Sequence, residues 1–192
     1  TEKKLFALKE PAIAGFPKLT MNQTAETKAL LSKYTQPIQA KDSKAKILLV
    51  EDPLCPACSA AYYDKTIQDN LKDFTQEALY FPLPSHKNSP KLVGILQANQ
   101  NHYELLGVML KADNLNTLSA LPEDKVYEKV VELAKAAGIN EVKDGEKLSE
   151  EKIKELQTLA LNLGLAGTPS FYVVTDKEYI PVTTFDMLKQ FK

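Results

Sequence analysis

The sequence predicts an α/β fold whose sheet is interrupted by an inserted helical region, and three observations predict it. An apolar run at residues 45–50 is followed by a segment of helical periodicity and by a second apolar run at 78–81, which is the order of a βαβ unit. Residues 89–164 show an almost wholly helical pattern. Two β-type runs and a short helical pattern then close the chain, so the insertion divides the sheet-forming sequence into two parts.

The composition is that of a globular protein with one well-buried core. The chain has 192 residues, of which 44% are hydrophobic, enough for a core domain with a modest insertion. All 24 cationic side chains are lysines, and the 25 acidic ones leave a formal net charge of −1. Without arginine, the chain lacks the side chain best suited to bidentate recognition of phosphate, so we expect no nucleic-acid partner. No run approaches the roughly 20 apolar residues of a membrane helix.

The N-terminal part is expected to form an arm, then a helix, then a strand. Residues 1–23 are irregular in pattern, with prolines and a glycine that interrupt long elements, and only residues 5–8 suit a short strand. Apolar residues then share one side of a helix at 24–34, which Pro37 ends. The run at 45–50 predicts a strand buried on both faces, as in a parallel sheet.

One amphipathic helix is predicted between the two strands of the βαβ unit. Its apolar positions are Ala60, Tyr63, Ile67, Leu71 and Phe74. The following strand, at 78–81, is closed by two nearby prolines. In the helical block, the lysines and acids that alternate between residues 143 and 154 are typical of a solvated helix face.

The C-terminal part predicts an antiparallel hairpin followed by a helix. Residues 170–174 and 179–182 are β-type runs separated by a turn of four residues. A last helix is expected at about 185–191, where Thr183 and Asp186 have the spacing of a capping box.

The chemistry-bearing motif is Cys55-Pro56-Ala57-Cys58, which holds the only two cysteines of the chain. Two cysteines separated by two residues can close and reopen a disulfide without rearranging the fold. Because Pro56 suits the first helical position, we place Cys55 at the N-cap, where free amides and the helix dipole lower a thiol pKa. Cys55 is then the attacking nucleophile, and Cys58, one turn into the helix and less accessible, is the resolving thiol.

Two other readings of the pair are a static disulfide and two coincidental buried thiols. A disulfide that closes so short a loop stabilises a fold weakly by the loop-entropy argument. Pro56-Ala57 supplies neither a side-chain donor nor a positive charge, so a strong oxidant is allowed by the sequence but not required.

A second motif, Gly167-Thr168-Pro169, stands just before the predicted strand at 170–174. Together the two motifs resemble the thioredoxin fold, and the lead Asp52-Pro53-Leu54 with the helical block resembles the bacterial Dsb proteins of the DsbA and DsbG types. The resemblance covers about residues 24–192. It implies an α/β thioredoxin-like core at 24–84 and 165–192, a helical insertion at 85–164 and an N-terminal arm at 1–23.

The resemblance also implies roles for further residues. Pro169 is expected to be cis and to pack against the cysteine pair, and Thr168 to bind the backbone of an extended substrate. Many such proteins carry a buried carboxylate at the position of Leu49, so this chain departs from the pattern. Glu51 is our candidate for proton transfer instead, although an exposed acid at a strand end is the commoner situation. DsbG proteins carry a sizeable dimerisation domain for which residues 1–23 are too short, which favours a monomer.

The predicted activity is thiol–disulfide exchange with reduced or misoxidised exported proteins, in the periplasm or another extracytoplasmic space. A DsbA-like oxidase is favoured, with a DsbG-like reductase or isomerase as the alternative. No cofactor is required, but a soluble or membrane-bound redox partner must recycle the cysteines. A non-catalytic metal-binding or chaperone-like protein is a further alternative, yet His86 and His102 have no familiar zinc spacing and we predict no metal site.

Overall fold

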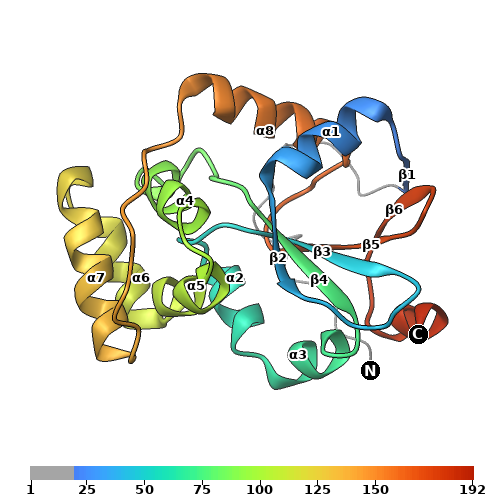
Figure 1. Ribbon diagram of the computed structural model, residues 1–192, viewed down its shortest axis with the longest axis horizontal. Coiled ribbons are helices and arrows are strands. Elements are labelled where there is room, and N and C mark those ends of the chain that lie inside the picture. The colour runs from blue at the N-terminus through green and yellow to red at the C-terminus, as the bar shows by residue number, and fades with distance from the viewer. Residues whose placement is uncertain (1–19) are drawn as a thin grey trace.

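The computed structural model describes residues 20–192, which form a mixed sheet covered by helices (Figure 1). The strands are β1 (Met21–Asn22), β2 (Thr35–Gln39), β3 (Lys46–Glu51), β4 (Thr75–Tyr80), β5 (Ser170–Val174) and β6 (Glu178–Pro181). The α-helices are α1 (Ala25–Tyr34), α2 (Pro56–Tyr62), α3 (Lys65–Leu71), α4 (Ser89–Gln97), α5 (His102–Leu110), α6 (Ala112–Ala120), α7 (Val126–Ala136) and α8 (Glu150–Asn162). Two 3₁₀ helices are η2 (Glu123–Lys125) and η3 (Asp186–Phe191).

The sheet has the strand order β1-β6-β5-β3-β4-β2. β3 and β4 are parallel, as the βαβ prediction requires, and every other neighbouring pair is antiparallel. The predicted hairpin is β5 and β6. β3 lies inside the sheet and is buried almost throughout, which is why its sequence reads as a continuous apolar run.

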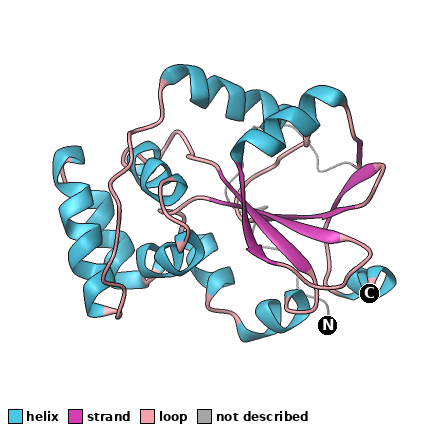
Figure 2. Ribbon diagram, viewed as in Figure 1, coloured by secondary structure: helices cyan, strands magenta, loops and turns pink. Residues whose placement is uncertain are grey.

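Alternate residues of β3 supply two separate cores, one on each face of the sheet. Leu48 and Val50 pack in a cluster that includes side chains of α1, α8 and the helices α4 to α7. Ile47 and Leu49 pack on the opposite face with side chains of α3 and the C-terminal segment. Figure 2 shows these layers, with helices above and below the magenta strands and a further group of helices at one end of the sheet. No helix within residues 20–192 is both long and apolar enough to span a membrane.

The two sheet edges contain strands that the sequence analysis did not predict. Met21–Asn22 pairs with β6, although these residues were assigned to the irregular arm. The predicted strand at 5–8 lies outside the described residues. Pro37 was expected to end a helix, but it lies within β2. A proline is tolerated there because β2 is an edge strand, and its register shifts just after Pro37.

The single helix predicted after the cysteines is wrong, because the segment forms two short helices. α2 ends at Tyr62, and the Asp64 side chain accepts a hydrogen bond from the Ile67 amide at 3.1 Å, which begins α3. Tyr63, placed on the apolar face by periodicity, is 56% exposed at the break between them. Ile67 and Leu71, by contrast, are buried as predicted.

The alternating lysines and acids lie partly outside any helix. α7 gives way to Gly138, whose φ is +88°, and residues 139–149 then run without regular structure along α4. The backbones touch: the Leu148 amide donates to the Pro90 carbonyl at 3.2 Å, and a Cβ on Gly94 would collide with the Glu146 carbonyl. Only α8 continues the helical pattern.

α8 covers the sheet, although it lies within the range 85–164 assigned to the insertion. Its Glu155 carboxylate pairs with Lys33 of α1 at 2.6 Å and accepts a hydrogen bond from the Tyr34 hydroxyl at 2.6 Å. At the C-terminus, the predicted helix is the 3₁₀ helix η3, whose N-cap is Phe185 rather than Thr183, and the Thr183 amide donates to the Met187 sulfur at 3.4 Å.

Candidate active site

The cysteine motif lies where β3 passes into α2. β3 ends at Glu51 and α2 begins at Pro56, so Cys55 is the N-cap residue, as predicted. The Cys55 carbonyl accepts the first helical hydrogen bond, from the Ser59 amide at 3.0 Å. Both cysteines are in the thiol form. The expected difference in accessibility is wrong for this form, because Cys55 and Cys58 both have 0% exposure.

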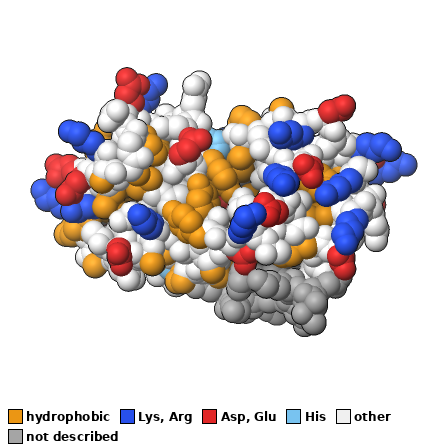
Figure 3. All heavy atoms as spheres, turned by 90° about the horizontal axis from the view of Figure 1, so that it is seen from below, with side chains coloured by type: hydrophobic (Ala, Val, Ile, Leu, Met, Phe, Trp, Pro, Cys, Tyr) orange, Lys and Arg blue, Asp and Glu red, His pale blue; other side chains and the backbone are white. Residues whose placement is uncertain are grey.

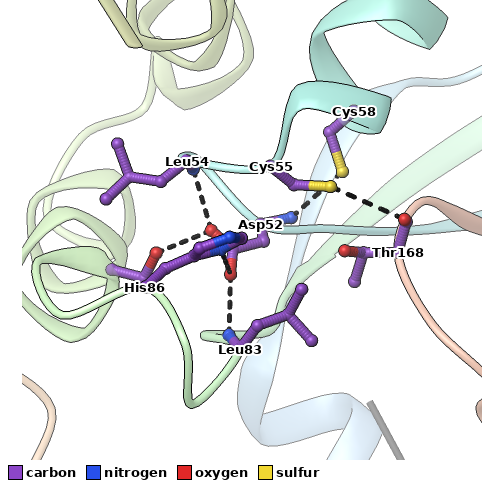
Figure 4. Close-up of polar contacts among 8 residues, drawn as sticks. Asp52, Leu54, Cys55, Cys58, Leu83, His86 and Thr168 are labelled. Atoms are coloured by element: carbon purple, nitrogen blue, oxygen red, sulfur yellow. Dashed lines mark hydrogen bonds and ion pairs between the residues drawn. The ribbon is translucent and has the colours of Figure 1, made fainter. Parts of the chain in front are cut away.

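The second motif meets the first because β5 pairs with β3 in antiparallel register. Val50 lies opposite Ser170, so the residues before β5 lie beside those that follow β3. The bond between Thr168 and Pro169 is cis, which confirms that prediction. The Cys55 sulfur lies 3.6 Å from the Thr168 carbonyl oxygen, and Figure 4 shows this contact. Residues 113 positions apart are therefore in direct contact.

The surroundings of Cys58 favour the protonated form of its thiol. Burial is the main cause of a raised pKa for the Cys58 thiol, and a hydrogen bond with Cys55 and the charges of Cys55 and Glu51 add to it. One contact acts in the opposite direction. The backbone amide of Asp52 lies 3.5 Å from the Cys58 sulfur, and this hydrogen bond lowers the pKa.

Glu51 is buried rather than exposed, with only 1% of its surface accessible. Its Oε2 atom has no hydrogen-bond partner among the described residues. Burial, and then the charge of Cys55, raise the Glu51 pKa to about 8. Side chains alternate along a strand, so Glu51 projects to the same face as Leu49, the position where the resembled proteins carry their carboxylate. The structure thus provides a buried acid that interacts electrostatically with both cysteines.

Asp52 is also fully buried, but its carboxylate is fully engaged. Oδ1 accepts hydrogen bonds from the Leu54 amide at 2.8 Å and the Ser89 hydroxyl at 2.6 Å. Oδ2 accepts one from the Leu83 amide at 2.6 Å and lies 3.0 Å from Nδ1 of His86. Figure 4 shows how these groups converge on the carboxylate from two segments of the chain.

Sequence reasoning missed two of these partners. In the sequence analysis, His86 was considered only as a possible zinc ligand, and no role was assigned to Ser89. The Asp52–Leu54 contact has a sequence signal, since an aspartate that bonds the amide two residues on forms a local turn. The contacts with His86 and Ser89 span 34 and 37 residues and have no such signal.

Thr168 is a third buried polar residue at the site. It is 0% exposed, and its hydroxyl oxygen makes no hydrogen bond with any residue between 20 and 192. Pro169 is also buried. Of the two residues, Thr168 contacts the Cys55 sulfur, through its carbonyl oxygen.

The second histidine belongs to the core away from the cysteines. His102 is 2% exposed, with Nδ1 at 2.6 Å from the Tyr80 hydroxyl and Nε2 at 2.8 Å from the Pro37 carbonyl. Burial lowers the His102 pKa. Among residues 20–192, no three His, Cys, Asp or Glu side chains are grouped so that they could hold a metal ion.

The molecular surface near α2 carries exposed apolar side chains. Figure 3 shows the face seen from below, where hydrophobic side chains gather in a band across the middle. Tyr62 and Tyr63 line a hollow of about 570 Å³ together with residues of α5, α6 and α7. The Tyr62 ring packs against Tyr103, whereas Tyr63 is largely exposed.

Solved structures with a similar fold are thioredoxin-like proteins. A periplasmic thioredoxin-like protein from Salmonella enterica serovar Typhimurium is 20% identical, with a TM-score of 0.58 over 88% of this chain and 94% of that chain. Proteus mirabilis ScsC in a compact conformation is 21% identical, with a TM-score of 0.52 over 86% and 75%. A thioredoxin-like oxidoreductase from Silicibacter pomeroyi DSS-3 is 15% identical, with a TM-score of 0.50 over 88% and 95%.

These likenesses confirm the predicted α/β, thioredoxin-like fold. At this level of identity they concern the fold alone. No protein-family model matches the sequence, and no curated protein matches it significantly.

Proposed function

We propose that this protein is a thiol–disulfide oxidoreductase that exchanges disulfides with exported proteins through Cys55 and Cys58, and that it acts as a DsbA-like oxidase. The observation that carries the proposal is the contact between the N-cap Cys55 and the carbonyl of Thr168, which precedes a cis proline. Two cysteines at a helix start, walled by a cis proline, form a site at which a partner sulfur can be positioned for in-line attack.

In the oxidising direction, a substrate thiolate attacks the Cys55 sulfur of the Cys55–Cys58 disulfide. A mixed disulfide with Cys55 forms, and Cys58 leaves as a thiolate. A second substrate thiolate then attacks the substrate sulfur of the mixed disulfide, which releases Cys55 and leaves the substrate oxidised by two electrons. The cysteine pair gains those two electrons, so a redox partner, soluble or membrane-bound, must remove them.

Glu51 is the residue proposed to move the proton of Cys58. A buried thiolate is unstable in this setting, because burial raises the Cys58 pKa. A carboxyl group with a pKa of about 8 is partly protonated near neutral pH, so it can donate a proton to the leaving Cys58 thiolate or accept one in the reverse direction. Its unpartnered Oε2 leaves an atom available for that transfer.

Thr168 and Pro169 are proposed to bind the substrate backbone beside Cys55. We assign the protein to the periplasm or another extracytoplasmic space, because the Salmonella protein of similar fold is periplasmic and disulfides persist in such compartments. It needs no cofactor, since the cysteine pair carries the electrons. We further propose that it acts as a monomer.

The deciding experiment is the reduction potential of the Cys55–Cys58 pair in glutathione buffers. A potential of about −120 mV, as for DsbA, would identify an oxidase, and one of about −270 mV, as for thioredoxin, would identify a reductant. If no reversible two-electron transition occurs, the exchange proposal is wrong, and a binding or chaperone-like role takes its place.

A second test uses Cys58→Ser, which leaves Cys55 without a resolving thiol. Mixed disulfides with substrate proteins then accumulate through Cys55 and can be isolated under non-reducing conditions. The matched control is Cys55→Ser, which retains the other cysteine and should trap far less. Equal trapping by both variants would contradict the assigned roles.

A further inference from the structure

The Asp52 carboxylate joins the cysteine loop to the helical insertion. It has 0% exposure and four partners at 2.6 to 3.0 Å. One partner, the Leu54 amide, lies in the cysteine loop. The other three, Leu83, His86 and Ser89, lie in the segment between β4 and the first turn of α4. Ser89 is the first residue of α4, the first helix of the range 85–164 assigned to the insertion.

The backbone of Asp52 contacts both cysteines. Its amide lies 3.5 Å from the Cys58 sulfur, and its carbonyl accepts a hydrogen bond from the Cys55 amide at 3.2 Å. The orientation of the residue therefore fixes where its amide points. Because the side chain is held on both oxygens, the backbone has little freedom to rotate away from the sulfur.

From this geometry we infer that Asp52 is a positioning residue for the resolving thiol, and that Ser89 and His86 of the segment entering the insertion hold it in place. The inference rests on the proposed exchange activity and adds residues that control the attack by Cys58 when the cysteine pair is reoxidised. The hydrogen bond from the Asp52 amide to the Cys58 sulfur stabilises the Cys58 thiolate, which burial disfavours.

The step affected is resolution of a mixed disulfide during oxidation of the cysteine pair. The Cys58 thiolate attacks the Cys55 sulfur, the Cys55–Cys58 bond forms, and the bond between Cys55 and the partner sulfur breaks. The partner sulfur leaves as a thiolate, so the cysteine pair loses the two electrons that the partner disulfide gains. Capture of the partner by Cys55 precedes this step and does not use the Cys58 sulfur.

A residue that only holds the fold together would alter stability without separating the two steps. Substitution of a residue that positions the Asp52 amide should instead slow resolution and leave capture nearly unchanged. The substitution should also raise the pH at which resolution reaches half of its maximal rate. The reason is that a weaker hydrogen bond from the Asp52 amide leaves the Cys58 thiolate less stable.

The experiment mixes the reduced protein with glutathione disulfide and stops the reaction with acid at set times. Mass spectrometry then separates dithiol, glutathione mixed disulfide and internal disulfide, which gives both rates. The variants are Ser89→Ala and Asp52→Asn. The control is Ser149→Ala, which removes an exposed serine hydroxyl that accepts a hydrogen bond from the Lys152 amide at the N-cap of α8, away from Asp52.

We expect Ser89→Ala to slow resolution by about tenfold and to change capture by less than about threefold, the size expected for one hydrogen bond to a charged group. The pH midpoint of resolution should move upward, and the mixed disulfide should accumulate. Ser149→Ala should match the wild type in both rates. Asp52→Asn should have the larger effect, and Ser89→Ala keeps the test decisive if that variant does not fold.

The inference is overturned if folded Ser89→Ala resolves the mixed disulfide at the wild-type rate, or if capture and resolution slow equally. Failure of the proposed function gives a different result, because the wild type itself then forms no internal disulfide from glutathione disulfide. A wild type that oxidises through a mixed disulfide, together with unaffected variants, rejects only the role of Asp52.

Discussion

Two buried carboxylates near the cysteine pair, those of Glu51 and Asp52, differ in how they are hydrogen-bonded. Glu51 and Asp52 are adjacent in sequence, and both are almost completely buried. One carboxylate oxygen of Glu51 has no partner within residues 20–192, whereas both oxygens of Asp52 are engaged by several groups. Burial alone therefore does not tell what an acid does. The hydrogen-bond partners of a buried carboxylate decide whether its position is fixed or one of its oxygens is left available for a proton.

The difference has a physical cause in the geometry of the strand end. Glu51 is the last residue of β3, and its side chain enters a region where burial disfavours charge. Asp52 lies just beyond the strand, where the segment after β4 folds back and presents the Leu83 amide and the Ser89 hydroxyl. The Leu54 amide of the cysteine loop is a further donor. Unsatisfied groups are costly, and they occur at sites where a proton or a ligand changes place.

Removing the engaged carboxylate should have the largest effect on stability. Asp52→Ala leaves two backbone amides and the Ser89 hydroxyl without their acceptor, and such a loss costs about 3–5 kcal/mol for a buried charged partner. The measurement is the free energy of unfolding in urea, under reducing conditions. Asp176→Ala, in the exposed turn between β5 and β6, is the control and should change it by less than about 0.5 kcal/mol. Equal effects of the two substitutions would contradict the comparison.

The contribution of Glu51 to the free energy of unfolding should depend on pH, because its carboxyl group changes protonation and its Oε2 atom has no hydrogen bond with the described residues to lose. Its folded pKa of about 8 lies above the ordinary value of 4.5, so the folded state holds a proton that the unfolded state has released between those values. Stability from this group is complete below about pH 4.5 and is lost as pH rises through 8. The loss between two pH values two units apart in this window is at most about 2.7 kcal/mol.

The check is urea unfolding of reduced wild type and Glu51→Gln at pH 5, 6 and 7. The glutamine variant cannot release this proton, so its stability relative to wild type should rise with pH. Glu141→Gln alters an exposed acid and should run parallel to the wild type. If the Glu51→Gln curve is also parallel, the carboxyl group does not hold a proton in the folded state.

The elements around the cysteines were predictable because their signals are local. A continuous apolar run marks β3, and Pro56 marks the first residue of α2. The break between α2 and α3 had a local signal too, since Asp64 is a good N-cap, but the regular spacing of apolar residues concealed it. Residues 139–149 were harder, because they are held by backbone contact with α4 and not by a periodic apolar face.

The site itself was predictable only in part, for the same reason. The meeting of Cys55 with Thr168 follows from two motifs whose neighbourhood is known from other proteins. The contacts of Asp52 with His86 and Ser89 depend on where the segment after β4 turns back, and no pattern in either stretch announces that. The burial of Glu51 depends likewise on the helices that cover the end of β3.

The smallest expected effect belongs to another buried group without a partner among the described residues, the Thr168 hydroxyl. Thr168 and Thr27 are both buried, but the Thr27 hydroxyl accepts a hydrogen bond from Thr24 at 2.9 Å, whereas that of Thr168 makes none with the described residues. Thr168→Val replaces an unsatisfied hydroxyl by a methyl group, so it should leave the free energy of unfolding unchanged or raise it by up to about 1 kcal/mol. Thr27→Val breaks a made bond and should lower it by about 1 kcal/mol.

Urea unfolding of the two reduced variants at one pH measures this difference, and its sign matters more than its size. Both substitutions exchange the same atoms at fully buried positions, so changes in volume and side-chain entropy largely cancel between them. A lower stability for Thr168→Val than for Thr27→Val would mean that the Thr168 hydroxyl is satisfied in the resting protein. Of Glu51 and Thr168, Glu51 alone would then have a buried oxygen without a hydrogen-bond partner among the described residues. That oxygen is the one proposed to take up a proton.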